Sequence, residues 1–282
     1  DTDYIDIYQV HYHDPDTCIE ETIEALEYLS KAGKIRHYGI GHLPLDITEE
    51  YLRKGNVSYV LAEMSPVSTA RYRELHPLQN IYGFDIIAFS ITGRGILSGK
   101  INKRVQFSKD DIRSKDPLFI KSRLHSGINM ASKLREIGSK YNMTPVQTAI
   151  LWTLQNQGVA AGLTGPTKID HLVENSKVLD MSLDEDSIME INQMIEMEED
   201  KLRQTVQDEV HAILTSPLSA DYEKAYKDLI YVLEYSIENQ YISYKNGVNI
   251  FMKIEEDRNS GSRSVRRLND YREKIKAEAS II

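Results

Sequence analysis

The stretch YIDIYQVHYHDPDTCIEETIEALEYLSKAGKIRHYGIG (residues 4–41) holds two β-favouring segments with a helical pattern between them. The first segment, residues 4–10, is rich in Ile, Tyr and Val, which favour strands. In residues 17–32 apolar side chains recur at three- and four-residue steps, and Gly33 follows where a helix stop is expected. Residues 35–40 favour a second strand. The stretch therefore predicts a strand–helix–strand unit with parallel strands.

The same alternation continues along the chain. Further strands are predicted at residues 57–64, 85–90 and 159–164. Thr144 and Pro145 are a helix-capping residue and a first-turn proline, and they predict the start of the helix before the last strand. Five strands alternating with helices predict an α/β fold of the (β/α)8 TIM-barrel type, in partial form because a complete barrel has eight strands.

Strand patterns stop after about residue 183. The segment 248–254 is ambiguous between helix and strand. Beyond residue 183, three helices are predicted, at residues 184–214, 220–244 and 263–279. We therefore expect two parts, a barrel portion over residues 1–195 and a mainly helical C-terminal extension over residues 196–282.

Composition limits the classes of function. The 282 residues are 41% hydrophobic, carry a formal net charge of −9 and include one cysteine, Cys18. One cysteine excludes an intrachain disulfide and a cysteine-built zinc site, and no metal site is expected. We expect a cytoplasmic protein with no membrane segment and no affinity for nucleic acid. Basic residues near the C-terminus leave nucleic-acid binding open as a weaker idea, but acidic residues lie among them and favour a solvated helix face. The basic residues are Arg258, Arg263, Arg266, Arg267 and Lys274.

Four segments resemble motifs of the aldo-keto reductase family. YIDIYQVHYHDP (residues 4–15) resembles the fourth barrel strand with its loop, and KIRHYGIGHLP (residues 34–44) resembles the fifth strand. IIAFSITGRGILSGK (residues 86–100) resembles the seventh strand. TPVQTAILWTLQNQGVAAGLTGPTKIDHLVEN (residues 144–175) resembles the eighth strand with the helices around it. The resemblance covers about residues 3–194, and it implies that strands four to eight of the barrel are present.

The family transfers hydride from a nicotinamide cofactor to a small aldehyde or ketone, with a catalytic group of Tyr, Lys, Asp and His. The first three residues precede the fourth strand in the family, so the resemblance implies that this chain lacks them. By resemblance His11 is the active-site histidine, which would hydrogen-bond the substrate carbonyl. The alternative is a histidine at the barrel rim that bonds a neighbour. His13 points to the same side of an extended chain, so a slip of register would exchange the two.

The resemblance also implies a set of cofactor-binding residues. Phe89 would stack on the nicotinamide, and Ser90, Gly93 and Arg94 on the following turn would meet the pyrophosphate. The other implied residues are Gly165, Thr167 and Lys168 for the phosphates, with His171, Glu174 and Asn175 on the adenine side. NADP is the expected cofactor. NAD also remains open, because His171 stands where the family often has arginine, and histidine is mostly neutral at pH 7.

Three positions depart from the family pattern. Gly41 and His42 replace the Ser-Asn pair that binds the nicotinamide carboxamide, and Glu63 replaces a Gln with the same role. An ionised carboxylate accepts hydrogen bonds but cannot donate them, so Glu63 can meet only the amide NH2 group. His42 can replace one lost contact. A divergent branch and weakened cofactor binding both remain open.

Two functions therefore remain open. One is an NAD(P)H-dependent reductase of a small carbonyl compound, provided that the N-terminal part exists in the natural protein. The other is a non-catalytic binding or regulatory module, a partial barrel closed by its extension or by a second chain. A tyrosine-rich helix in the extension would cover the barrel opening, form a homo-oligomer interface or act as a lid. Its tyrosines are Tyr222, Tyr226, Tyr231 and Tyr235.

Overall fold

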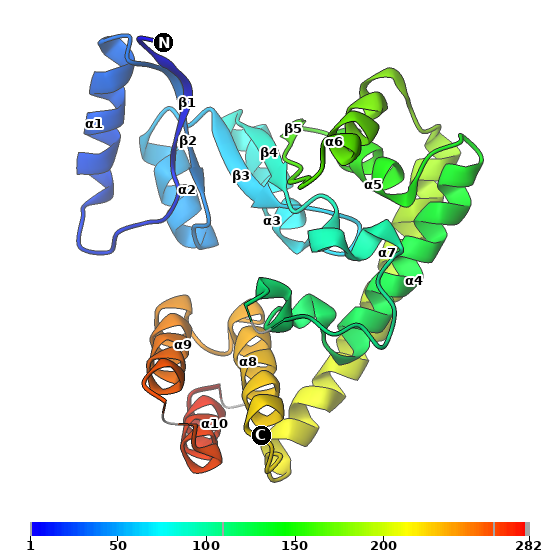
Figure 1. Ribbon diagram of the computed structural model, residues 1–282. Helices are drawn as coiled ribbons and strands as arrows, with labels where there is room; N and C mark the ends of the chain where they lie inside the picture. Colours follow the sequence, from blue (N-terminus) through cyan, green and yellow to red (C-terminus); the bar gives the residue numbers. More distant parts are fainter. Residues whose placement is uncertain (1, 109, 262, 280–282) are drawn as a thin grey trace. The chain divides into compact units, whose positions relative to one another are not determined.

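A five-stranded parallel sheet forms the centre of the N-terminal region (Figure 1). The computed structural model describes residues 2–108, 110–261 and 263–279. Each strand pairs in parallel with the next one along the chain, so the strand order equals the sequence order. The predicted α/β architecture with a parallel sheet is confirmed. The strands are β1 (Ile5–Val10), β2 (Ile35–Gly41), β3 (Tyr59–Glu63), β4 (Asp85–Phe89) and β5 (Val159–Gly162).

Helices connect the strands and bury one face of the sheet. The first three are α1 (Ile19–Lys31), α2 (Leu45–Lys54) and α3 (Ala70–Tyr82). Ile19, Ile23 and Leu26 are the buried residues of α1, and their spacing is the helical period that the sequence shows. They join a buried cluster with residues of β2, β3 and β4. Its members from the sheet include Tyr38, Ile40, Val60, Ala62 and Ile86.

Helices α4 (Lys121–Ser139) and α5 (Pro145–Leu154) lie between β4 and β5 in the chain, and α6 (Ile169–Ser176) is the first helix after β5. Thr144 caps α5, with Pro145 at its first position and Gln147 completing a capping box, as the sequence predicts. Short 3-10 helices are η1 (Gly93–Ser98), η2 (Ile112–Ser114), η3 (Pro117–Phe119) and η4 (Lys177–Asp180).

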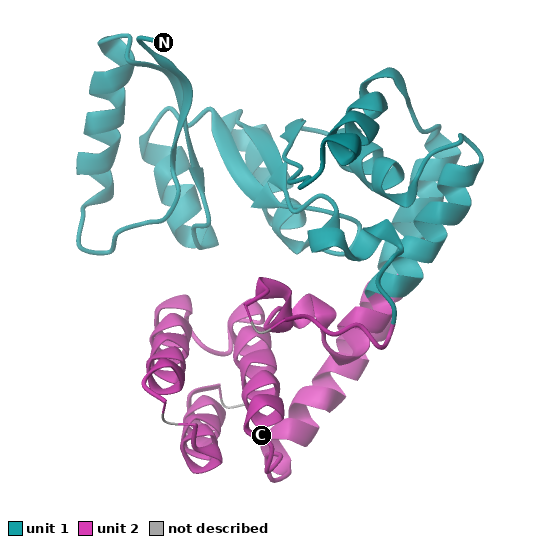
Figure 2. Ribbon diagram, viewed as in Figure 1, with its two compact units in different colours: residues 1–102, 127–196 teal, residues 103–126, 197–282 magenta. Residues whose placement is uncertain are grey.

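The chain divides into two compact units (Figure 2). Unit 1 comprises residues 1–102 and 127–196, and unit 2 comprises residues 103–126 and 197–282. Residues 103–126 group with the C-terminal helices in this division, because Lys115, Lys121 and Arg123 form ion pairs with carboxylates of those helices. The expected division into a barrel portion (residues 1–195) and a helical extension (residues 196–282) stays a prediction.

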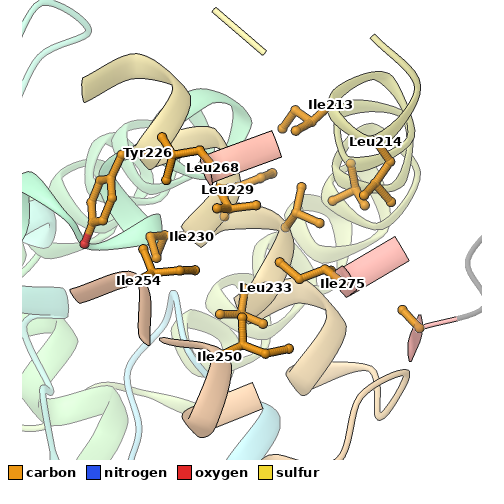
Figure 3. Close-up of a cluster of buried hydrophobic side chains, with 14 of the residues drawn as sticks. Ile213, Leu214, Tyr226, Leu229, Ile230, Leu233, Ile250, Ile254, Leu268 and Ile275 are labelled. Carbon is orange, nitrogen blue, oxygen red and sulfur yellow. The ribbon is translucent and has the colours of Figure 1, made fainter. Parts of the chain in front are cut away.

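Unit 2 is helical and has its own apolar core (Figure 3). Besides the later part of α7 (Glu185–Thr215), it contains α8 (Tyr222–Glu238), α9 (Tyr244–Asn259) and α10 (Val265–Ala279). The ambiguous segment 248–254 is thus helical. The labelled core side chains are Ile213, Leu214, Tyr226, Leu229, Ile230, Leu233, Ile250, Ile254, Leu268 and Ile275. Among the helices of the described residues, none combines the length and the apolar character that crossing a membrane requires.

The tyrosines of α8 serve this core. Tyr226 and Tyr231 are each 1% exposed, and Tyr222 and Tyr235 pack against the cluster. The Tyr226 hydroxyl donates to Glu255, and the Tyr231 hydroxyl donates to Glu209. Because Tyr226 and Tyr231 are buried inside unit 2, these two rings are not available to cover another surface.

Glu255 lies at the centre of a partly buried charge network. Its carboxylate accepts from Tyr226 and pairs with Lys115 at 2.9 Å. Arg258 places its guanidinium 4.1 Å from the ring centroid of Tyr226 and donates to Glu223 at 3.1 Å. The Arg258 side chain is only 12% exposed, so a solvated helix face was the wrong description of this residue.

A close approach between β2 and β3 explains one strand glycine. A Cβ atom added to Gly41 would lie 2.9 Å from the Cβ of Leu61, and these two residues are partners in the parallel register. Real side chains do not tolerate such a contact without movement of the strands. The space for the serine that the resemblance led us to expect at this position is therefore filled by Leu61.

Replacing Glu255 by Gln should lower the free energy of unfolding by about 1–3 kcal/mol at neutral pH. Burial opposes ionisation of Glu255, but the Tyr226 hydroxyl and the Lys115 ammonium outweigh it and hold the pKa of this carboxyl below its ordinary value. A folded pKa below the unfolded value of about 4.3 adds stability above that pH, and this stability is lost as the pH falls through the folded pKa. Urea unfolding at a series of pH values measures both effects.

The exposed neighbour Glu256 provides the control, since Glu256→Gln should change stability by less than about 0.5 kcal/mol. The E255Q deficit should be full above about pH 5 and shrink below about pH 4. A deficit that stays constant across this range would show that charge is not its cause.

Replacing Gly41 by Ala should destabilise unit 1 by about 1–3 kcal/mol, because the added methyl group overpacks the contact with Leu61. Gly165→Ala is the matched control, since nothing lies within 4 Å of a Cβ built there. Thermal unfolding followed by circular dichroism compares the two variants with the parent chain. Equal melting temperatures for both variants would contradict the close approach.

Candidate functional site

The carboxyl ends of the parallel strands bring the candidate residues to one edge of the sheet. His11 follows β1 directly, and His42 follows β2. Glu63 and Phe89 are the last residues of β3 and β4, and they are partners in the register. Catalytic groups of barrel enzymes lie at this edge. The sheet therefore gathers side chains that are far apart in the sequence.

Four aromatic rings form a cluster at this edge. The ring centroids of His11 and His42 are 4.7 Å apart, and their planes differ by 12°, so the two imidazoles are stacked. The His42 ring also lies 5.2 Å from that of Tyr12 and 4.8 Å from that of Phe89. His42 thus links His11 to Phe89, and both of those residues were predicted to be in the site.

The two histidines of the first loop take different positions. His13 lies edge-on to Tyr51, a buried residue of α2, with 6.3 Å between the ring centroids. His11 instead joins the cluster at the carboxyl edge. Of the two candidates that a slip of register would exchange, His11 is the one in the cluster.

His42 has an unusual backbone conformation. Its φ is +51°, a left-handed value that costs free energy in any residue with a side chain. Arg71 of α3 stabilises the loop that follows, because its Nη2 donates to the Leu43 carbonyl at 2.9 Å and to Thr48 Oγ1 at 2.8 Å. Burial, and then the charge of His11, lower the pKa of His42 below its ordinary value. The His42 imidazole is therefore neutral at pH 7.

Glu63 and Arg94 form an ion pair beside this cluster. Arg94 Nη1 donates to the Glu63 carboxylate and to Ser90 Oγ, the latter at 3.2 Å. Both charged side chains are more than two-thirds buried. Ser90 and Arg94 have left-handed φ values of +56° and +51°. The cation expected to meet pyrophosphate is therefore already bound to a carboxylate of the neighbouring strand.

Gly93 is required by packing as well as by backbone geometry. Its φ is +55°, and an added Cβ would lie 2.9 Å from side-chain atoms of Val67 and Ile96. Glycine is the residue that adopts this φ without strain. Gly93 fits a tight turn after β4 whether or not a phosphate binds there.

The loop after β5 is open and precedes the start of α6. Gly165, Thr167 and Lys168 are exposed, and Lys168 occupies the N-cap position of α6 without capping it through its side chain. Unpaired N–H groups at a helix start, with a cation beside them, suit a phosphate group. The residues present thus fit the phosphate end of a dinucleotide.

The adenine-side candidates lie on α6. His171, Glu174 and Asn175 are half-buried, and Gln147 of α5 donates to the backbone carbonyl of Glu174 at 2.8 Å. That bond fixes α6 against α5. The binding roles of all these residues, and of His11 and Phe89, stay predictions.

Two contributors to the edge were not anticipated. Tyr12 was not considered, although its ring lies 4.7 Å from that of His11; its place next to a candidate histidine was the available signal. Arg71 carried no signal, because a lone arginine at a helix start is common on any surface. Its role depends on the tertiary contact with the loop after β2.

The chain is similar to several known proteins. An aldo-keto reductase of Bacillus subtilis, YhdN, is 28% identical over 198 residues, which cover 69% of this chain and 59% of that protein. An NADH-specific methylglyoxal reductase of Escherichia coli is 28% identical, with coverages of 69% and 60%. A glycerol dehydrogenase structure from Gluconobacter oxydans superposes with a TM-score of 0.63 at 23% identity, with coverages of 68% and 59%.

The matches show the family of the chain and how much of the relatives' length it covers. The chain spans about 60% of the length of these relatives. The family model described as "Aldo/keto reductase family" matches residues 1–196. On this match, and on the TIM-barrel type of fold that it shares with its structural neighbours, the chain belongs to the aldo/keto reductase family.

Proposed function

We propose that this protein reduces a small aldehyde or ketone with NADPH as the preferred cofactor. The observation that carries the proposal is the meeting of His11, His42 and Phe89 at the carboxyl edge of a parallel sheet, with the open start of α6 following the neighbouring strand β5. A cytoplasmic location fits the composition, and the native partner is a small-molecule carbonyl compound.

In this proposal the five strands are the fourth to eighth strands of an eight-stranded barrel. Strands one to three, with the Tyr, Lys and Asp of the catalytic group, then belong to the same natural protein. The outer strands support the assignment, because β1 and β5 each pair with one neighbour in the described residues. Ile5 and Tyr8 of β1 are each 46% exposed. Parallel strands of this kind are normally covered on both sides.

Each residue of the site has a defined task in the reaction. His11 donates a hydrogen bond to the substrate carbonyl oxygen and helps to deliver the proton. The Phe89 ring stacks on the nicotinamide, and Glu63 accepts from the carboxamide NH2 group. Lys168 and the N–H groups at the start of α6 bind phosphate. When bound, the cofactor supplies the hydride for the carbonyl carbon.

The reaction itself should require the catalytic group of the whole barrel. We expect no measurable reduction of simple aldehydes by the 282-residue chain, since His11 alone supplies little of the usual rate enhancement. The protein encoded by the complete gene should reduce such aldehydes catalytically. NADPH oxidation followed at its absorbance band with a panel of small aldehydes and ketones tests both. Inactivity of both forms, together with no calorimetric binding of NADPH or NADH, would favour the non-catalytic module.

Cofactor choice should depend on the start of α6. Lys168→Ala should weaken NADPH binding about tenfold, whereas Lys177→Ala in η4 should leave it unchanged. His171→Arg should raise the preference for NADPH over NADH about tenfold, because a guanidinium pairs with a 2′-phosphate in two parallel hydrogen bonds. Isothermal titration calorimetry with both cofactors measures these effects. An equal loss in K168A and K177A would show that long-range charge, and not a phosphate site, controls affinity.

A further inference from the structure

His42 occupies a position that packing alone does not explain. Its backbone is strained at φ +51°, yet the segment after it is fixed by two hydrogen bonds from Arg71. A strained residue persists only where its surroundings determine its conformation, and such residues gather at functional sites. Histidine is among the residues that tolerate this region best. The strain directs attention to what the side chain contacts.

The side chain of His42 contacts the residue that is expected to handle the proton. The stack with His11 is nearly parallel, and Phe89 contacts the same His42 ring. Ring pairs at such distances attract each other beyond the effect of their buried area. This attraction favours one orientation of an otherwise exposed imidazole, and His11 is exposed.

We propose that His42 is a positioning residue, whose ring stacks on His11 and so fixes the orientation of that imidazole. The Phe89 ring contacts the His42 ring and holds it in place. The inference rests on the proposed reductase function for its catalytic consequence. The stack itself is independent of that function. His42 is therefore assigned to hold His11 through its ring, and its nitrogen atoms are not required for this task.

The charges around His42 allow this role. His11 and Tyr12 face it from the segment after β1, and Phe89 faces it from β4. Arg71, which bonds the next residue, is paired with Glu74. Two stacked imidazolium rings would repel each other, and the lowered pKa of His42 leaves it neutral beside His11.

Two substitutions of His42 separate positioning from cofactor binding. His42→Phe keeps a flat ring and removes the nitrogens, whereas His42→Asn removes the ring and retains a residue that tolerates a left-handed backbone. If the ring positions His11, H42F keeps kcat within about threefold and H42N lowers it about tenfold or more without raising the KM for cofactor. If H42N instead keeps kcat while H42F raises the cofactor KM, the proposal is overturned. The complete protein is used for these kinetics.

A spectroscopic measurement tests the stack without any activity. In NMR spectra of the 282-residue chain, the His11 ring protons should show ring-current shifts that persist in H42F and become smaller in H42N, where the Tyr12 ring alone remains beside His11. The His42 titration should also move to higher pH in His11→Asn, because the charge of His11 lowers the His42 pKa. His37→Asn is the control: His37 of β2 lies edge-on to Tyr59 of β3, so this substitution should alter neither signal.

The kinetic measurement and the NMR measurement can contradict the two proposals independently. Absence of turnover in the complete parent protein would remove the proposed reductase function, while the NMR stack would still be measurable. A ring-current shift of His11 that is as large in H42N as in the parent chain would overturn the positioning role even if the protein is an active reductase. Melting temperatures of H42F and H42N identify a variant that fails to fold. In that case the shift of the His42 titration in H11N tests the contact between the two histidines without the unfolded variant.

Discussion

The candidate site depends on the parallel pairing of the strands. Because β1 to β5 all run in one direction, every strand ends at the same edge of the sheet. His11 and Phe89, which are distant in the sequence, then lie on the same aromatic cluster, because the His42 ring contacts both of them. An antiparallel pairing of the same segments would send alternate strand ends to opposite edges. The strand–helix connections that enforce parallel pairing therefore also build the site.

Charge compensation is the second feature of this edge. The Glu63 carboxylate, which departs from the family pattern, is balanced by Arg94 from the turn after β4. Removing a carboxylate from water in this way is costly unless a cation pairs with it. The substitution at position 63 and the place of Arg94 are thus parts of one arrangement. In the proposed function, a phosphate that approaches Arg94 would compete with Glu63, so Lys168 and the start of α6 would carry more of the phosphate binding.

Unit 2 uses tyrosines and carboxylates in a different way. Its core buries Tyr226 and Tyr231 and leaves their hydroxyls bonded to Glu255 and Glu209. A buried phenol requires such a partner, so Glu209 of α7 and Glu255 of α9 complete this core by accepting from the two hydroxyls.

The sequence by itself determined the order of the five strands, the parallel α/β class, the cap at Thr144 and the family, because these follow from local periodicity and from motifs in a fixed order. It left the segment 248–254, part of α9, ambiguous between helix and strand. It also named His11 and Phe89. Tertiary structure alone decided which partners these residues meet: the stack of His42 on His11, the pairing of Glu63 with Arg94 and the membership of residues 103–126 in unit 2. Those contacts join segments distant in the chain, and their geometry depends on strand register and helix packing, which no local pattern encodes.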